Sequence, residues 1–327
     1  MPSSVKEIAV IIPCFNGAEF IDRCLDSAWN QTLSPSEIIV VDDGSTDTSI
    51  DHIQAWRQRH PTAPVRLIRQ PNKGVSAARN TGCETASSEW LAFLDIDDVW
   101  HSDHNEILAA LTNSHSDTVL AFCDAQRIDH ETGNMPTFFT NAGILEMLQG
   151  RAENTCLHGD RIHTRLVTGS FIPTSCTLVR RSAFSAVGGF DQDIRFGEDR
   201  QLWLKLFNVG RVVVSACLGA EKYYHDSNAT HERNRINELS GKIQLYDKFK
   251  QERKLYSFTS EQLCLLEDYK KNDLYRIRYS ASKLGVRAML QHQSFLRDSG
   301  TSYSLKDWVR GIFTSLINRF KGASRSL

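Results

Sequence analysis

The amino-acid sequence predicts an α/β protein with a mixed, mostly parallel sheet flanked by helices and a helical extension at the C-terminal end. Short β-branched runs alternate with segments of helical spacing from residue 7 to residue 128. Polar side chains directly follow several of these runs, as they do at the ligand-binding edge of a parallel sheet. From about residue 235 the spacing is mostly helical and the segment is richly charged. These three observations together predict the fold class.

The composition is that of an ordinary globular protein, with 327 residues of which 41% are hydrophobic. The formal net charge of −1 gives no overall positive field, so we expect no nucleic-acid partner. The 8 cysteines include no Cys-x-x-Cys pair, which argues against a zinc site and favours reduced thiols in a cytoplasmic protein. We expect no signal peptide in residues 1–7 and no membrane-spanning helix, which needs roughly 20 apolar residues.

The predicted elements alternate along the first part of the chain. Five short apolar runs, several of them β-branched, are predicted to be strands of a buried sheet: 7–15, 37–43, 65–70, 90–95 and 118–128. The segments between them place apolar residues at helical spacing and are predicted to be helices: 18–31, 48–60, 74–86 and 104–114. Strands joined by helices of this length imply right-handed crossovers and a mostly parallel sheet covered on both faces.

Ligands of such sheets bind at the carboxyl ends of the strands. The side chains that follow the first, second and fourth predicted strands are polar: Asn16, Asp42, Asp43, Asp95, Asp97 and Asp98. We therefore expect several strands to deliver acids to one edge of the sheet.

Beyond residue 130 the pattern loosens, and it resumes in residues 174–191 and 197–210. No repeat or low-complexity linker marks a sharp boundary, so we expect a domain over residues 1–235 and a helical extension over residues 236–327. The last predicted helix, residues 305–325, is amphipathic with a basic flank. We expect its apolar stripe to pack against the protein's own body or a second subunit; the alternative is peripheral contact with the inner face of an anionic membrane.

Asp95, Asp97 and Asp98 lie within four residues of one another, and no basic residue stands beside them in the sequence. Hard divalent cations such as Mg²⁺ or Mn²⁺ bind a few carboxylates together with phosphate oxygens. These acids therefore predict a metal site. The alternative is that they form a turn and cap the next helix.

Two other charged stretches could serve either a functional or a purely structural role. Residues 72–82 place Lys73 and Arg79 among small residues, as close approach of a phosphate-bearing ligand requires, but small residues also let a helix pack tightly on a sheet. Glu198 and Asp199 begin a predicted helix, where the helix dipole favours acids whether or not they take part in chemistry.

Five stretches resemble, in this order and at these spacings, the family-two inverting glycosyltransferases of GT-A fold. They are "VIIPCFNGAEFIDRCLDSAWNQT", "EIIVVDDGSTDTS", "PNKGVSAARNTG", "WLAFLDIDDVW" and "VGGFDQDIRFGEDRQLWLKL". Each motif alone is weak, but their combination is specific and spans roughly residues 7 to 230. The resemblance implies a Rossmann-like GT-A domain that binds a nucleotide-sugar.

The resemblance also implies which residues bind the donor. It places Pro13, Phe15 and Glu19 in the nucleotide pocket, Asp42 and Asp43 at the base, and Arg79 along the nucleotide. Asp95 and Asp97 match the DxD pair, with Asp95 facing the ribose and Asp97 helping to hold the metal that bridges the diphosphate. His225 stands where relatives carry a histidine that reaches the diphosphate or metal; the alternative is a surface histidine.

The implied reaction is a single displacement at the anomeric carbon that inverts its configuration. Asp199 matches the acid of the family's "ED" motif, the base that accepts the proton of the acceptor hydroxyl, with Glu198 beside it. We expect a UDP-sugar donor and a glycan or lipid-linked acceptor in polysaccharide or glycoconjugate synthesis. The alternatives are a nucleotidyl or sugar-phosphate transferase, and a catalytically silent protein that binds nucleotide-sugar or assists assembly of a glycan-synthesis complex.

Overall fold

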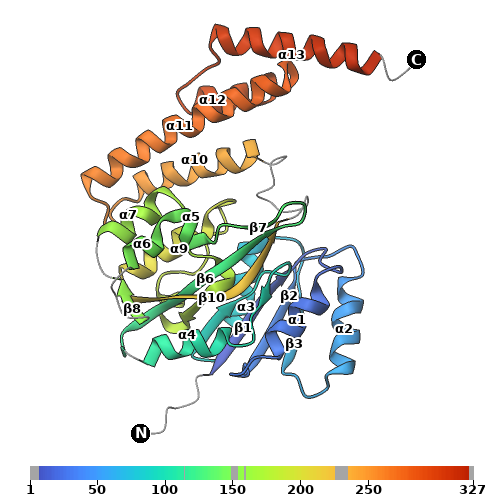
Figure 1. Cartoon of the computed structure of the whole chain (residues 1–327), viewed down its shortest axis with the longest axis vertical. Helices are drawn as coiled ribbons and strands as arrows, with labels where there is room; N and C mark the ends of the chain where they lie inside the picture. The colour runs from blue at the N-terminus through green and yellow to red at the C-terminus, as the bar shows by residue number, and fades with distance from the viewer. Residues whose placement is uncertain (1–6, 114, 149–153, 158–159, 225–234, 324–327) are drawn as a thin grey trace. The chain divides into compact units, whose positions relative to one another are not determined.

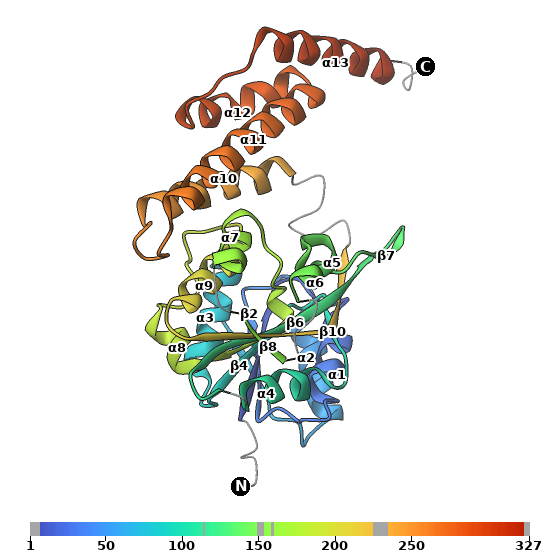
Figure 2. The ribbon, with the colours of Figure 1, turned by 60° about the vertical axis from the view of Figure 1, so that its left-hand side comes forward.

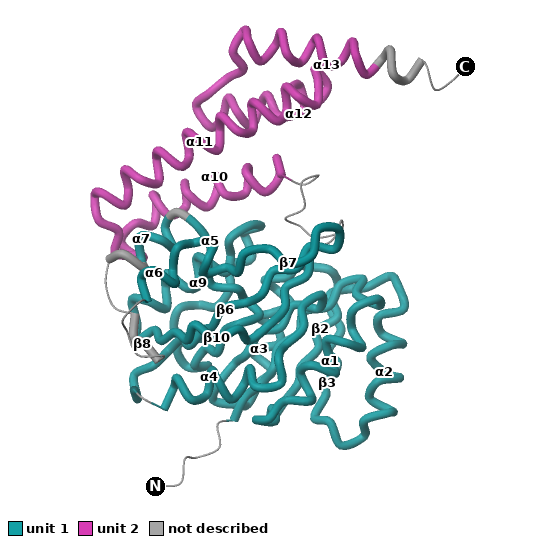
Figure 3. The backbone as a smooth tube through the Cα atoms, viewed as in Figure 1, with its two compact units in different colours: residues 1–226 teal, residues 227–327 magenta. Residues whose placement is uncertain are grey.

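The computed structural model describes residues 7–113, 115–148, 154–157, 160–224 and 235–323. The chain divides into two compact units, residues 1–226 and residues 227–327, which Figure 3 shows in different colours. The first unit contains the sheet and the second consists of helices (Figure 1). Each unit has its own hydrophobic core.

The strands at one side of the sheet are parallel to one another. They are β1 (Ile8–Cys14), β2 (Glu37–Asp42), β3 (Val65–Arg69) and β4 (Trp90–Phe93). β1 is central to this group, since it pairs in parallel with β2 on one side and with β4 on the other. The first four predicted strands are thereby confirmed, each one or two residues shorter than expected.

The other side of the sheet is mixed. β9 (Thr177–Arg180) runs antiparallel between β4 and β6 (Thr118–Asp129), and β10 (Arg211–Tyr224) runs parallel to β6. Three shorter strands pair antiparallel with these: β5 (Val99–Trp100), β7 (Gly133–Met135) and β8 (Asn154–Leu157). In the described part of the chain the main order is β3-β2-β1-β4-β9-β6-β10-β5. The predicted mixed, mostly parallel sheet is confirmed.

Helices cover both faces of the sheet, which lies between two groups of helices in Figure 2. One group shares a core with the sheet: α1 (Ile21–Trp29), α2 (Ser49–Arg59) and α4 (His104–Asn113). The other group contains α3 (Val75–Thr85), α8 (Arg181–Ala186) and α9 (Glu198–Phe207). The described elements between β7 and β9 are short: α5 (Phe138–Ala142), α6 (Ile144–Leu148), α7 (Asp160–Thr168) and the 3₁₀ turn η1 (Thr174–Cys176).

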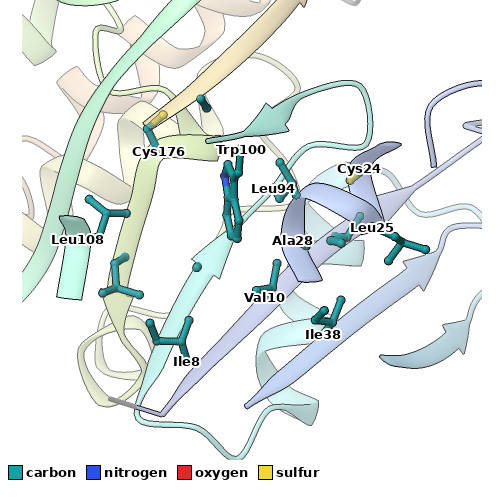
Figure 4. Packing of buried hydrophobic residues seen from close by; sticks show 14 of the residues in the cluster. Ile8, Val10, Cys24, Leu25, Ala28, Ile38, Leu94, Trp100, Leu108 and Cys176 are labelled. Atoms are coloured by element: carbon teal, nitrogen blue, oxygen red, sulfur yellow. The ribbon is translucent and has the colours of Figure 1, made fainter. Parts of the chain in front are cut away.

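The core beneath α1 is built from alternate residues of the strands. Ile8 and Val10 of β1 and Ile38 of β2 pack with Leu25 and Ala28 of α1, and all five are fully buried (Figure 4). Fully burying a valine, leucine or isoleucine side chain contributes about 1.5 to 3 kcal/mol. The residues between them in β1 and β2 are buried on the opposite face, so these central strands read as continuous apolar runs.

On the opposite face, α3 lies very close to the sheet. A β-carbon at Gly82 would lie 2.6 Å from Cγ2 of Ile11 and 3.3 Å from Cγ2 of Val41. The close-packing interpretation of this small-residue segment is therefore confirmed at Gly82. Arg79, one helical turn earlier, is carried on the same helix and is only 4% exposed.

A buried histidine lies in the core of the first unit. The ring of His104 stacks on Trp100 with 3.9 Å between ring centroids, and neither ring is more than 3% exposed. Its possible ligand atoms lie within 4.8 Å of the thiols of Cys123 and Cys176, a proximity that the cysteine spacing in the sequence did not indicate. Burial lowers the pKa of His104 to about 3, so the ring is neutral at physiological pH.

The described part of the second unit, residues 235–323, is built from helices. Its helices are α10 (Arg235–Gln251), α11 (Ser260–Leu284), α12 (Val286–Asp298) and α13 (Leu305–Ala323). Thr259 and Gln262 form a capping box that fixes the start of α11. Ile277, Ala281 and Met289 are fully buried in its core. Among the described helices, none is long and apolar enough to cross a membrane.

We predict that His104 makes the protein sensitive to acid. Its folded pKa of about 3 lies below the unfolded value near 6.5, so between these values the unfolded state binds the extra proton and stability falls as pH falls. The His104→Phe variant keeps a ring against Trp100 but cannot be protonated. The free energy of unfolding of the wild type should therefore drop relative to this variant by about 1.4 kcal/mol per pH unit between pH 6 and pH 4. Urea unfolding across this range measures the difference, and parallel pH profiles would contradict the prediction.

Candidate active site

The loops that follow β1 and β2 are joined at the carboxyl edge of the sheet. The Asp43 amide donates a hydrogen bond to the Cys14 carbonyl (2.8 Å). Asn16 donates its amide to Ser45 Oγ (2.9 Å) and accepts at Oδ1 from the Thr46 amide (2.8 Å). Asn16 has a positive φ of 51°, a conformation that asparagine adopts more readily than most residues. These contacts bring the polar residues that follow β1 and β2 together at one edge of the sheet, as predicted.

Asp42 and Asp43 are buried behind this edge, being 1% and 3% exposed. Asp43 accepts hydrogen bonds from the side chain of Gln70 (2.7 Å) and from the amides of Lys73 (2.9 Å) and Gly74 (2.7 Å). The carboxylate thus holds the turn that begins α3. Recognition of a nucleotide base by these two acids stays a prediction.

The other residues expected in a nucleotide pocket differ in exposure. Pro13 is buried within β1, where it pairs with Val41, and Glu19 is exposed. Phe15 leaves 49% of its surface exposed although it is a large apolar side chain at this edge. An exposed ring is suited to stack on a planar ligand.

Arg79 joins two of the candidate acids. Its two terminal nitrogens donate to Asp95 Oδ1 (2.6 Å) and to Glu198 Oε1 (2.9 Å). Asp95 follows β4 and Glu198 begins α9, so the guanidinium ties together segments that are far apart in the sequence. Burial alone would lower the pKa of Arg79, but the charges of Asp95 and Glu198 hold it above its ordinary value.

Lys222 of β10 joins a second pair of acids. Its Nζ lies 2.9 Å from Asp98 Oδ2 and 3.3 Å from Asp95 Oδ2, and the charge of Asp97 also acts on it. No basic residue stands beside this cluster in the sequence, but the fold places Lys222 against it. The fold supplies a lysine from more than 120 residues farther along the chain.

Ser175, in η1, forms hydrogen bonds with two of the same acids, Asp95 and Asp98. Its hydroxyl donates to Asp98 Oδ2 (2.5 Å) and accepts from the Asp95 amide (3.1 Å). Its carbonyl oxygen accepts from the indole Nε1 of Trp100 (2.5 Å). Ser175 thus fixes the turn after β4 against the core.

The acids that Arg79 and Lys222 join differ in how readily they ionise. Burial would raise the pKa of Asp95, but Arg79 and Lys222 hold it below its ordinary value. Burial raises the pKa of Asp98 to about 7, against the opposing effect of Lys222. Burial, followed by the negative charge of Asp199, also raises the pKa of Glu198. Burial and the neighbouring charges together therefore decide how readily each of these acids ionises.

Asp199, the predicted base, lies at the start of α9 and is partly exposed. It accepts a hydrogen bond from the amide of Arg200 (2.6 Å) and long ones from the hydroxyls of Ser170 (3.4 Å) and Thr174 (3.5 Å). Thr174 precedes Ser175, which contacts Asp98. Two consecutive residues therefore link Asp199 to the acids that follow β4.

The residues after β4 fit a hard divalent cation. Carboxylate oxygens of Asp95, Asp97 and Asp98 lie within 4.8 Å of one another. Oδ1 of Asp98 is buried and has no hydrogen-bond partner among the described residues. Oxygen donors of this kind are those that Mg²⁺ and Mn²⁺ prefer.

The structure brings Asp95, Asp97, Asp98, Arg79 and Glu198 together, and the roles of these residues stay a prediction. His225 lies outside the described residues. Lys222 and Ser175 were missed, because a lysine near the end of a strand and a serine before another carry no local signal of a shared site.

A comparison with protein families finds a match to the model of glycosyl transferase family 2 over residues 9–188. Among curated relatives, an uncharacterized glycosyltransferase YibD of Escherichia coli is 36% identical over 41% of this chain and 38% of its own. The chondroitin synthase of Escherichia coli is 30% identical over 63% of this chain and 27% of its own. The uncharacterized glycosyltransferase EpsJ of Bacillus subtilis is 30% identical over 69% and 63%. The aligned stretches thus span less than two thirds of each relative.

Solved structures share the fold at low sequence identity. TarS (residues 1–349) of S. aureus in complex with UDP-GlcNAc has a TM-score of 0.63 at 18% identity, over 90% of this chain and 80% of that chain. The mannosyltransferase PcManGT of Pyrobaculum calidifontis, in complex with GDP-Man and Mn²⁺, has a TM-score of 0.62 at 15% identity, over 99% and 81%. The predicted GT-A fold is confirmed. Because the family match covers more than half of the sequence, the chain belongs to glycosyl transferase family 2.

Proposed function

We propose that this protein transfers a sugar from a nucleoside-diphosphate sugar, with UDP as the nucleotide, to an acceptor hydroxyl with inversion at the anomeric carbon. The observation that carries the proposal is the linkage of two sets of acids at one edge of the sheet. Thr174 and Ser175 contact Asp199 and Asp98 respectively, and Arg79 joins Glu198 to Asp95. A displacement needs a base on one side of the sugar and stabilisation of the leaving group on the other.

The donor side would consist of Phe15, Arg79, Asp95 and Asp97. The solved relatives named above hold UDP-GlcNAc in one case and GDP-Man with Mn²⁺ in the other, which supports a nucleotide-sugar as the donor class. The exposed ring of Phe15 offers a stacking surface for a base. The acceptor would be a glycan or a lipid-linked glycan, as in polysaccharide synthesis, and the chondroitin synthase relative supports that class.

Charge explains why a metal ion belongs to this proposal. Asp95, Asp97, Asp98 and Glu198 together exceed the positive charge of Arg79 and Lys222, so the site would repel a bare diphosphate. Asp97, with Asp95 and Asp98 beside it, would hold Mg²⁺ or Mn²⁺ at this site. Such an ion, when bound, neutralises the negative charge that develops on the leaving diphosphate.

Asp199 would accept the proton of the acceptor hydroxyl. Its partial exposure leaves it open to an incoming acceptor, and its contacts with Ser170 and Thr174 orient the carboxylate. Glu198 cannot easily share this role, because its carboxylate is bound to Arg79. Glu198 would instead position α9 against the donor side.

We predict that Asp97→Ala abolishes metal-dependent nucleotide binding. In the wild type, UDP with Mn²⁺ should raise the unfolding temperature, because a ligand present at about 100 times its Kd stabilises the native state by about 2.7 kcal/mol. The variant should lose most of that shift in a thermal-unfolding assay with and without Mn²⁺. Asp103→Asn, at an exposed aspartate on the same segment, is the matched control and should behave as the wild type. An unchanged shift in Asp97→Ala would remove Asp97 from the metal site.

We predict that Asp199→Asn lowers kcat at least 100-fold, in the range that general-base catalysis contributes, with nucleotide binding unchanged. Transfer from radiolabelled UDP-sugars to a panel of glycan acceptors measures kcat, and calorimetry with UDP and Mn²⁺ measures binding. Asp193→Asn, at an exposed aspartate ahead of α9, is the control. Near wild-type transfer by Asp199→Asn would exclude it as the base. Donor binding without transfer in the wild type would favour the catalytically silent alternative.

We predict that Lys222→Met makes the protein depend on metal for stability. Without the ammonium, Asp95 and Asp98 repel each other, so the variant should lose at least about 1 kcal/mol of unfolding free energy. Mn²⁺ alone should restore more stability to this variant than to the wild type, because the ion takes over neutralisation of both carboxylates. Lys222→Arg keeps the charge and should show no enhanced response. Thermal unfolding with and without Mn²⁺ measures all three proteins, and a response in Lys222→Met no larger than that of the wild type would argue against a cation site here.

A further inference from the structure

The terminal helix α13 packs one of its faces within the second unit. Asp307 pairs with Arg278 of α11 (2.7 Å), and Ser315 Oγ accepts a hydrogen bond from the amide of Val286 at the start of α12 (2.9 Å). Gly311 is buried so closely that a β-carbon would lie 2.3 Å from the sulfur of Met289. These contacts fix the rotation of the helix about its own axis.

The opposite face of α13 is apolar and exposed. Six large side chains at spacings of three and four retain between 38% and 81% of their surface: Leu305, Val309, Ile312, Phe313, Leu316 and Ile317. Their spacing makes one continuous stripe, and the buried face described above leaves no freedom to turn it inward. An apolar stripe of this extent on a charged protein marks an interaction surface. We expected this stripe to pack against the protein's own body or a second subunit. Within the second unit it does not, because the opposite face of α13 makes the contacts with α11 and α12.

The two units have opposite charge. Residues 227–327 carry 19 lysines and arginines against 10 aspartates and glutamates, whereas residues 1–226 carry 19 against 29. The net charge of −1 is therefore the sum of an acidic first unit and a strongly basic helical unit. Lys306 is exposed on α13 beside the apolar stripe, and Arg287 and Arg297 are exposed on α12; none of these three forms an ion pair among the described residues.

We propose that the apolar stripe of α13 lies in the headgroup region of a membrane rich in anionic lipid, with the basic residues of the second unit over the lipid phosphates. An amphipathic helix with an exposed apolar face and cationic surroundings binds such a surface through buried apolar area and charge together. A second copy of this chain fits less well, because a symmetric contact would place two strongly basic units against each other. The proposal does not depend on sugar transfer, so its test needs no substrate.

Co-sedimentation of the full chain with lipid vesicles tests the proposal. The wild type should bind vesicles of equimolar phosphatidylglycerol and phosphatidylcholine, bind phosphatidylcholine vesicles at least tenfold more weakly, and lose binding as salt screens the charges. Ile312→Glu/Phe313→Glu should bind at least tenfold more weakly than the wild type. Both side chains are exposed, so circular dichroism and the unfolding temperature should be unchanged.

Gln54→Glu/Gln58→Glu is the matched control, since it adds the same charge at exposed positions of α2 in the first unit without touching the stripe or the basic residues of the second unit, and it should retain most of the binding. Ile312→Ala/Phe313→Ala removes apolar area without adding charge and should also bind more weakly. Absence of wild-type binding to either vesicle would overturn the proposal. Equal loss in the control, or a dimer in sedimentation velocity that Ile312→Glu/Phe313→Glu abolishes, would overturn it as well.

Discussion

The row of alternating charges Glu198, Arg79, Asp95, Lys222 and Asp98 is the interaction on which the rest of the site depends. Each cation lies between two acids, and the members come from α9, α3, the turn after β4 and β10. Removal of one cation would leave two partly buried carboxylates facing each other, which costs far more than the loss of a surface ion pair. The row therefore holds four segments in one arrangement and orders the site before any ligand arrives.

The row also separates the acids by task. Asp95 is held ionised by Arg79 and Lys222, whereas burial raises the pKa of Asp98 to about 7, so Asp98 is only partly ionised at physiological pH. Asp97 lies beside Asp95 and Asp98, whereas Asp199 follows Glu198 at the start of α9. We propose that Asp97 binds the metal and that Asp199 accepts a proton. Two carboxylates with separate environments can perform separate tasks in one reaction, as an acid and a base often do in one active site.

Sheet topology makes this arrangement possible. β1, β2 and β4 are parallel and bring their carboxyl ends to one edge. The antiparallel strand β9, inserted between β4 and β6, begins just after Thr174 and Ser175 and so carries these two residues to the same edge. Open α/β sheets bind their ligands at this edge, outside the carboxyl ends of the strands.

The sequence by itself determined the first four parallel strands, the helices between them and the acids that follow them, because burial on both faces and helical spacing leave strong local patterns. It also determined the amphipathic character of α13. Only the tertiary structure decided that Lys222 neutralises Asp95 and Asp98, that Ser175 supports them, and that the apolar stripe of α13 remains exposed. The physical reason is that ion pairs and burial depend on distances in space, and Lys222 lies more than 120 residues from its partners with no periodic pattern to connect them.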